Sequence, residues 1–376
     1  MKATLSTAAL LNELQTAARI ASSRSAVQAL SGVQLDVSDG ALELRATDME
    51  VGLRLRVPAE QISAGVAVLP ARLLLDVVRA LPSADVSLEL HVAEQAVRLV
   101  SGTAVFELRT LRNEDFPHLP LAPADGGVML DAPAFIDTVA RVARSASRDD
   151  TRPVLTGILV SVSDSSLRMV ATDSYRLSVK TTQLEEAVAS PFEANVPARA
   201  LQELARIAQQ TAAKQIGVAR LDNQVVFTLA GAGSDVSDAM LSSRLIDGQF
   251  PNFQQLLPET SEHELLLPRE ELADVVRRIS LLAQKNSPLR LGFSEGELRV
   301  SAQTPDVGEA HETLPLSFAG EAFEIGFNPE FLRDGLESVE SEEILIKLSS
   351  PLRPGLIESA DGSGFVYLVM PIRLGT

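Results

Sequence analysis

The chain of 376 residues contains no cysteine and no tryptophan, and only 4% of its residues are aromatic. The absence of cysteine excludes disulfides, thiolate metal sites and a thiol nucleophile. No stretch approaches 18 consecutive apolar residues, so we expect no membrane span and take a cytoplasmic location as the default. Neither GxxxxGK[ST] nor GxSxG occurs. The sequence therefore shows no phosphate-binding loop and no nucleophile elbow.

Histidine is also scarce. In no helical stretch does one of the four carry a second histidine or a carboxylate three or four residues further on; they are His91, His118, His263 and His311. Zinc sites of helical proteins depend on such spacing, so we expect neither a metal nor any other cofactor.

Positive charge is in deficit as well, with 33 Lys or Arg against 50 Asp or Glu and a formal net charge of −17. Taken alone, this balance argues against nucleic acid, because phosphate binding normally requires a basic surface. A minority of the surface can still carry the opposite sign.

The chain is rich in internal repeats. ATDMEV (46–51) recurs as ATDSYR (171–176), and AQTPDV (302–307) is a degenerate third copy. A proline also opens a helical stretch of about three turns in each of LPARLLLDVVRALP (69–82), VPARALQELARIAQ (196–209) and FNPEFLRDGLESVE (327–340). Repeats of this size, in the same order, indicate one structural unit used three times.

Three further helical stretches begin at Leu5, Ala132 and Pro268. Segments with a two-residue period lie between the helices and predict antiparallel hairpins. We therefore predict an α+β fold of three similar domains, each with two helices packed on antiparallel sheet. Their predicted ranges are 1–122, 128–259 and 264–376.

Asp48 and Asp173 of the repeated phrase have two interpretations. They could serve a carboxylate-dependent hydrolase or lyase, together with Asp247. Alternatively, the Thr and Asp side chains end a strand and bind the backbone of a turn. Recurrence in register with helices and hairpins favours the turn.

Basic residues concentrate on the predicted helices. Arg141, Arg144 and Arg148 follow an i, i+3, i+7 spacing that places them on one helical face, and Arg278 and Lys285 are a heptad apart. The six helical windows together hold 14 basic and 10 acidic residues; they are 5–24, 70–80, 132–148, 197–208, 268–285 and 328–339. The last window breaks the pattern, with a net charge of −2. Such helices could form a mildly positive lining that attracts a phosphate backbone, or they could be ordinary solvated helix faces.

Over its full length the chain resembles the bacterial DNA polymerase III β subunit, the sliding clamp. The stretches that carry the resemblance are Arg24 after the first helix, ATDSYRL (171–177), DGQFPNFQQLLP (247–258) and the terminal YLVMPIRL (367–374). The resemblance implies a head-to-tail homodimer that closes into a ring, with helices around the hole and duplex DNA held without sequence preference.

The resemblance also implies a function. The chain would be a non-enzymatic processivity factor, without cofactor, placed on DNA by a separate clamp loader complex. It would tether the DNA polymerase III α subunit, other polymerases and repair proteins through short clamp-binding peptides.

The residues that the resemblance assigns form three sets. Those facing DNA are Arg24, Arg72, Arg79, Arg141, Arg144, Arg148, Arg199, Arg206, Arg278 and Lys285. Those at the dimer interface are Phe106 and Leu108 in AVFELRTL (104–111), opposite Leu281 and Leu282. Those binding the partner peptide, between the second and third domains, are Leu155, Thr172, Ser174, Tyr175, Arg176, Leu177, Pro251, Leu256, Asn328, Phe331, Leu352, Val369, Met370, Pro371, Ile372 and Arg373.

The chain departs from the family pattern in three places, one of which is a tail that continues past Leu374 with Gly375 and Thr376. Gln255 stands where the family often has an arginine, and Asp149, Pro153 and Val154 stand where some members place Gln and Tyr near DNA. Besides the enzyme, a ring-shaped scaffold that never binds DNA remains an alternative.

Overall fold

The computed structural model describes residues 1–22, 25–123, 127–185, 187–188, 191–230, 237–258, 260–283, 287–305 and 307–374. Over these residues the fold is α+β, with six α-helices and antiparallel strands that form four sheets. The chain divides into two compact units: the first is Met1–Pro133 with Arg199–Leu245, and the second is Ala134–Ala198 with Ile246–Thr376. No helix of the described residues is long and apolar enough to cross a membrane.

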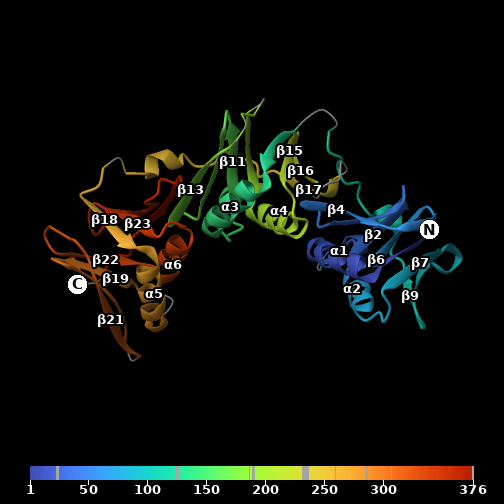
Figure 1. Ribbon diagram of the computed structural model, residues 1–376, viewed down its shortest axis with the longest axis horizontal. Helices are drawn as coiled ribbons and strands as arrows, with labels where there is room; N and C mark the ends of the chain where they lie inside the picture. The colour runs from blue at the N-terminus through green and yellow to red at the C-terminus, as the bar shows by residue number, and fades with distance from the viewer. Residues whose placement is uncertain are drawn as a thin grey trace. The chain divides into compact units, whose positions relative to one another are not determined.

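The first unit (Figure 1) contains a five-stranded sheet, β5-β1-β7-β8-β9, and an eight-stranded sheet, β10-β15-β16-β17-β4-β3-β2-β6. Its strands are β1 (Lys2–Ser6), β2 (Gly32–Ser38), β3 (Ala41–Thr47), β4 (Val51–Pro58), β5 (Glu60–Ser63), β6 (Gly65–Pro70), β7 (Asp85–His91), β8 (Ala96–Ser101), β9 (Ala104–Arg109), β10 (Val128–Asp131), β15 (Gln215–Leu221), β16 (Gln224–Ala230) and β17 (Ser237–Arg244). We call the antiparallel pairing of β4 with β17 the first joint.

The second unit contains an eight-stranded sheet, β14-β11-β12-β13-β25-β24-β23-β18, and a four-stranded sheet, β21-β20-β19-β22. Its strands are β11 (Gly157–Ser163), β12 (Ser166–Thr172), β13 (Arg176–Gln183), β14 (Phe192–Pro197), β18 (His263–Pro268), β19 (Leu289–Ser294), β20 (Glu297–Thr304), β21 (Gly308–Pro315), β22 (Phe323–Phe327), β23 (Glu343–Leu348), β24 (Gly355–Ser359) and β25 (Phe365–Val369). We call the antiparallel pairing of β13 with β25 the second joint. Both joints connect strands far apart in the chain, so each unit contains part of the predicted central domain. The domain limits 1–122, 128–259 and 264–376 therefore stay a prediction.

All six predicted helices are present; α4 extends two residues beyond its predicted window, and the other five are shorter than theirs. They are α1 (Thr7–Ile20), α2 (Ala71–Arg79), α3 (Ala132–Val142), α4 (Ala198–Gln210), α5 (Arg269–Ile279) and α6 (Pro329–Glu337). Figure 1 shows α1 beside α2 in the first unit and α5 beside α6 in the second. Leu10, Leu14 and Ile20 of α1 are fully buried, at the spacing of a helix that covers a sheet with one face.

The prolines mark the helix starts with one difference from the prediction. Pro329 occupies the first turn of α6, behind Asn328, whose side chain accepts hydrogen bonds from the backbone N–H groups of Glu330 (2.9 Å) and Phe331 (3.2 Å). Pro70 and Pro268 instead lie one residue before α2 and α5, at the N-cap. At either position the missing proline N–H costs nothing, because the first N–H groups of a helix have no partner within it.

Candidate functional site

The repeated ATD phrase builds the same turn twice. Thr47 Oγ1 donates to the carbonyl of Val51 (2.8 Å), and Thr172 Oγ1 donates to the carbonyl of Arg176 (2.6 Å). One carboxylate oxygen of Asp48 accepts two backbone N–H groups of its turn (3.1 and 2.8 Å), and Asp173 does the same (2.9 and 3.0 Å). The turn interpretation is confirmed at both copies.

The other carboxylate oxygen of each aspartate binds an arginine. Asp48 pairs with Arg199 (2.7 Å) and Asp173 with Arg176 (3.1 Å). Both oxygens of each carboxylate are therefore bonded within the chain. Among the described residues, no three His, Cys, Asp or Glu side chains are grouped so that they could hold a metal ion. Asp306 of the third copy lies outside the described residues.

The two joints are equivalent in their hydrogen bonding and differ in their side chains. Beside each repeated turn, a backbone N–H from the second strand's end reaches a turn carbonyl: Arg244 donates to Glu50 at the first joint, and Met370 donates to Tyr175 at the second, both at 2.9 Å. Glu50 and Arg244 are exposed and oppositely charged. Tyr175 is 60% exposed and Met370 is 40% exposed, and both side chains are largely apolar. The same backbone position is therefore charged in the first unit and apolar in the second.

Tyr175 and Met370 are part of what we call the apolar patch, which also includes Leu256, Phe331 and Leu352. Leu256 and Leu352 are 49% and 62% exposed, and the ring of Phe331 lies 6.4 Å from that of Tyr175. Leu352 shortly precedes β24, whose Gly355 pairs with Val369. Exposed apolar side chains collected on one surface are typical of interaction sites.

The predicted peptide-binding residues separate into two layers. Ser174, Tyr175, Pro251, Leu256, Asn328, Phe331, Leu352, Met370, Pro371, Ile372 and Arg373 are exposed or half-buried, whereas Leu155, Thr172, Arg176, Leu177 and Val369 are buried. Leu177 belongs to an apolar cluster with Phe250 and Leu368, against which Phe253 and Leu257 pack. The buried layer thus holds β13, β25 and the 250–257 segment together, and the exposed layer is free to touch a partner.

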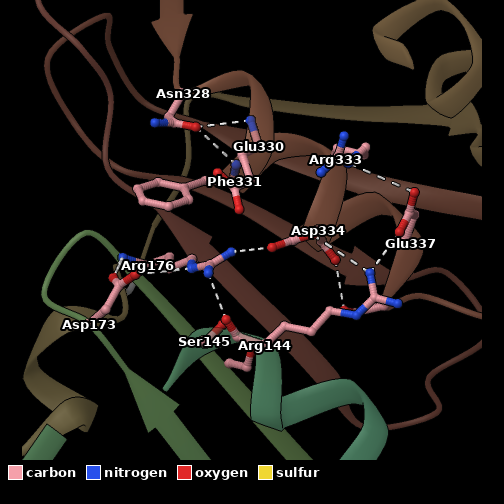
Figure 2. Close-up of polar contacts among 12 residues, drawn as sticks. Arg144, Ser145, Asp173, Arg176, Asn328, Glu330, Phe331, Arg333, Asp334 and Glu337 are labelled. Carbon is pink, nitrogen blue, oxygen red and sulfur yellow. Dashed lines mark hydrogen bonds and ion pairs between the residues drawn. The ribbon is translucent and has the colours of Figure 1, made fainter. Parts of the chain in front are cut away.

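Arg176 is the centre of a polar network directly below the patch (Figure 2). Its guanidinium donates to Asp334 Oδ2 (2.6 Å), to Asp173 Oδ2 (3.1 Å) and to the backbone carbonyl of Arg144 (2.6 Å). Its Cζ atom lies 4.4 Å from the centre of the Phe331 ring, in a cation–π contact. Arg176 therefore ties the repeated turn to α6, which carries both Asp334 and Phe331.

Arg144 adds a second connection to the same helix, as Figure 2 shows. Its guanidinium pairs with Glu337 (2.6 Å) and lies 3.6 Å from Asp334. Asp334 and Glu337 were not among the predicted site residues. The sequence feature that could have identified them is the net charge of −2 in the window 328–339, which differs from the basic pattern of the other helices. Two of its acidic residues, Asp334 and Glu337, bind Arg144 and Arg176.

Tyr367 completes the buried base of the site. Its hydroxyl donates to the carbonyl of Phe331 (2.8 Å), and burial raises the pKa of its phenol. Burial by itself lowers the pKa of Arg176, but Tyr367 and the carboxylate of Asp334 outweigh this effect, and the pKa is raised overall. Gly335 lets α6 approach the ring, because a Cβ atom there would lie 2.5 Å from Tyr367.

Arg141 was predicted to face DNA, and this prediction is wrong. It is only 7% exposed, and its guanidinium donates to the carbonyl of Ser338 (2.6 Å) and pairs with Asp137 (2.6 Å) and Glu340. These bonds use four of the five N–H donors of the guanidinium, and its burial keeps it from the surface that a phosphate could reach. The shared face of Arg141, Arg144 and Arg148 also fails, because α3 ends at Val142 and a 3₁₀ turn, Ala143–Ser145, follows.

The remaining predicted DNA-facing arginines are exposed: Arg72, Arg79, Arg144, Arg148, Arg199, Arg206 and Arg278. Most are paired with acid in the chain; Arg79 binds Asp76, Arg206 binds Glu203, and Arg278 binds Glu312. Arg24 and Lys285 lie outside the described residues.

The excess of basic residues in the predicted windows lies outside the observed α-helices. The six α-helices as observed hold ten arginines and ten acidic residues, a net charge of zero. The four further basic residues of the predicted windows, Arg24, Arg144, Arg148 and Lys285, all follow the C-terminal ends of α1, α3 and α5.

The predicted interface residues lie on β9 and in a 3₁₀ turn, Ser280–Leu282, that follows α5. β9, which contains Phe106 and Leu108, is the last strand of the five-stranded sheet and has one open edge. Leu108 is only 7% exposed in the single chain, and its place at the interface stays a prediction. Phe106 is half-buried, Leu281 is 84% exposed and Leu282 is half-buried.

Comparisons with known proteins agree with this architecture. Family models of the DNA polymerase III beta subunit match in three parts: the N-terminal domain over residues 1–120, the central domain over 129–252 and the C-terminal domain over 254–373. The beta sliding clamp of Synechococcus elongatus is 34% identical, over 96% of this chain and 98% of that protein, and the beta sliding clamp of Vibrio cholerae is 30% identical over 100% of both.

Solved structures match over their full length as well. The crystal structure of a DNA polymerase sliding clamp from Pseudomonas aeruginosa superposes with a TM-score of 0.89 at 30% identity, and that of the DNA polymerase III beta subunit from Thermotoga maritima with 0.89 at 27%, each covering 100% of both chains. The fold is thus the three-domain α+β architecture of sliding clamps. The chain belongs to the DNA polymerase III beta subunit family.

Proposed function

We propose that the chain is a DNA polymerase processivity factor, a sliding clamp that encircles duplex DNA and tethers a polymerase to it. Family membership over the whole length supports this role, and the relatives named above are sliding clamps. The chain would be an accessory subunit of DNA polymerase III without catalysis of its own, active in the cytoplasm where replication takes place. The carboxylate enzyme is not favoured, since Asp48 and Asp173 are bound within turns.

The observation that carries the ring is the pair of strand edges left open. Counted from the first helix of each repeat, the third strand of one repeat pairs at both joints with the last strand of the next repeat: β4 with β17, and β13 with β25. By the same equivalence β21 is a third strand and β9 a last strand, and each lies at the open edge of its sheet. Pairing β9 of one chain with β21 of a second, and the reverse, would leave neither edge open, as a closed head-to-tail ring requires.

DNA would be retained by topology with weak direct contact. The α-helices carry no net charge, and arginines such as Arg199 and Arg278 are already paired with carboxylates. Affinity for linear DNA should therefore be low and should fall further with salt. Since the chain has no phosphate-binding loop, a separate ATP-driven loader would have to open the ring.

Retention on DNA tests the ring directly. The protein would be loaded by a clamp loader onto nicked circular duplex DNA and passed through gel filtration in high salt, before and after linearisation of the circle. We expect co-elution with the circle and loss from the linear form. Equal loss from both, with a loader shown to act on a known clamp, would refute encirclement and favour a scaffold that does not hold DNA.

The apolar patch is the proposed site for clamp-binding peptides of partner proteins, including the polymerase α subunit, other polymerases, repair proteins and the loader. Its aromatic and Met side chains can bury apolar anchors, and methionine adapts to different shapes. The equivalent surface of the first joint carries Glu50 and Arg244 in place of Tyr175 and Met370. A peptide with apolar anchors should thus occupy one site in each chain.

A matched pair of variants tests this assignment. Met370→Ala should weaken binding of a Gln-Leu-x-Leu-Phe peptide about tenfold or more, because a buried Met contact contributes about 1.5–3 kcal/mol. Arg244→Ala alters the equivalent position of the first joint and should leave the affinity unchanged. Fluorescence polarisation of a labelled peptide measures both. Equal affinity for Met370→Ala and the unmodified protein would refute the site while leaving the ring untouched.

A further inference from the structure

The joint that closes the proposed ring can be derived residue by residue from the two joints inside the chain. Equivalent hydrogen bonds align the last strands of the three repeats. The backbone N–H of Leu111 donates to the carbonyl of Val68, that of Ile246 to Asn195, and that of Ile372 to Gly326. In each repeat the acceptor lies on the strand before the second helix, which is β6, β14 or β22. Leu111 and Ile246 follow Arg109 and Arg244 by two residues, as Ile372 follows Met370. Arg109, Arg244 and Met370 are therefore equivalent.

The third strands align through their hairpins. The alanine that begins each repeated phrase faces a residue of the following strand: Ala46 faces Leu53, Ala171 faces Ser178 and Ala302 faces Ala310. Leu53, Ser178 and Ala310 are therefore equivalent, and so are the residues before them, Gly52, Leu177 and Glu309.

The observed registers can now be transferred. At the first joint Leu241 faces Leu53 and Ser242 faces Gly52; at the second, Tyr367 faces Ser178 and Leu368 faces Leu177. The two joints agree in every one of these positions. Transferred to β9 and to β21 of a second chain, the register places Val105 opposite His311, Phe106 opposite Ala310 and Glu107 opposite Glu309.

Charges alternate across the sheet that ends at β9. One row of facing residues runs from Lys2 on β1 to Glu89 on β7, Arg98 on β8 and Glu107 on β9. The Lys2 ammonium and the Glu89 carboxylate are 3.1 Å apart. The next residue of this row, across the closing joint, would have to be basic to continue the alternation. It is Glu309, and behind it on β20 lies Gln303.

We infer that the closing joint of the ring contains a repulsive pair of carboxylates, Glu107 facing Glu309 of the second chain. This inference rests on the ring proposed above. The corresponding pairs inside the chain are neutral, Ser242 with Gly52 and Leu368 with Leu177. Like charges directly opposite each other on paired strands destabilise the pairing. The joint between chains is thus the weakest of the three, and it is where the ring opens.

Arginines near the pair offset the repulsion in part. Arg98 faces Glu107 from the other side, and Arg109 would lie diagonally from Glu309. The guanidinium of Arg109 already donates to the backbone carbonyl of Glu94, which holds it to its own unit. Neither arginine lies between the two carboxylates.

Sedimentation equilibrium of the full chain tests the inference through the monomer–dimer Kd. Glu309→Gln removes one negative charge at the joint, while Glu295→Gln makes the same change in net charge at the exposed turn between β19 and β20. Because a ring has two closing joints, Glu309→Gln should lower the Kd about 2- to 30-fold. Glu295→Gln should lower it much less, because Glu295 lies beyond Glu297 at the other end of β20, about 20 Å from the pair, where exposed charges are screened.

The outcomes distinguish a failure of the facing carboxylates from a failure of the proposed ring. Equal effects of Glu309→Gln and Glu295→Gln would overturn the facing carboxylates, since net charge alone would then explain the change. A chain that stays monomeric at all concentrations would overturn the ring itself. Circular dichroism of each variant shows whether it is folded.

Cysteine pairs test the register independently, because the chain has no cysteine of its own. Val105→Cys with His311→Cys places two thiols directly opposite each other and should give a disulfide between chains on mild oxidation. Val105→Cys with Thr313→Cys is shifted by two residues and should not. Crosslinking of the shifted pair in preference to the facing pair would overturn the register.

Discussion

Replacing Arg176 by methionine is the most informative test of the network under the apolar patch. Methionine keeps the packing of the side chain but removes the charge, which leaves Asp334 without its closest cation. The two side chains are 9% and 14% exposed, so this is a buried ion pair. Removing one partner of such a pair typically costs about 3–5 kcal/mol, because the other charge stays buried. We expect a loss of this size in the unfolding free energy of the second unit.

Hydrogen exchange of amides in β13 and α6 is the suitable assay, since a chain of several domains need not unfold in one step. Arg278→Met is the matched control: Arg278 binds Glu312 through two hydrogen bonds (3.0 and 2.6 Å), but both side chains are more than a third exposed, so the loss should be much smaller than for Arg176→Met. The double change Arg176→Met with Asp334→Leu should recover part of the loss, because Asp334 then leaves no buried charge, while Asp173 still lacks its arginine. Equal losses for Arg176→Met and Arg278→Met, or additive losses in the double variant, would refute the reasoning.

Two other predictions concern the phenol below the patch and the repeated turn. Burial raises the pKa of Tyr367, so in a Tyr175→Phe chain, which keeps Tyr367 as its single tyrosine, ultraviolet absorbance should show no phenolate before unfolding. The unfolded phenol ionises near pH 10 and the folded one higher, so stability should fall as the pH rises above about 10; phenolate in the folded protein near pH 10 would contradict this. Asp48→Ala leaves the backbone N–H groups of Glu50 and Val51 without their acceptor and should cost about 1–3 kcal/mol in urea unfolding. Asp247→Ala is its exposed control, expected within about 0.5 kcal/mol, and equal effects of the two would show that the turn does not depend on the carboxylate.

The helices and turns could be predicted from the sequence because local patterns specify them. The three stretches opened by a proline and the three further helical stretches located all six helices, and the repetition of ATD in register with the hairpins identified a turn from its residue types alone. Both features depend on residues close together in the chain, where propensity and hydrogen-bonding chemistry suffice.

The roles of the charged residues could not be predicted in the same way, since their partners are distant in sequence. Arg141 has the spacing of a surface residue, but it is buried against Ser338 and Glu340, nearly 200 residues away. Helix ends caused the other error: with α3 ending at Val142, Arg148 no longer shares a face with it. The network around Arg176 belongs to the same class, because Asp334 contacts it only through the pairing of β13 with β25.

The joints also determine when parts of the sheets can form during synthesis, because the two strands of each joint are made far apart in time. β4 ends at Pro58, but its partner β17 begins at Ser237, and β13 ends at Gln183 while β25 begins at Phe365. At about 5–20 residues per second, each third strand waits roughly 10–35 seconds for its partner. During that time it presents an open edge to any strand nearby, including the equivalent strand of a neighbouring nascent chain. The charged end of the first joint, Glu50 with Arg244, and the apolar end of the second, Tyr175 with Met370, give the two waiting edges different chemistry. A wrong pairing would place Glu50 beside Met370, or Tyr175 beside Arg244. Such a mismatched strand pair is less stable than the correct one, so the strand would exchange its wrong partner for the correct one.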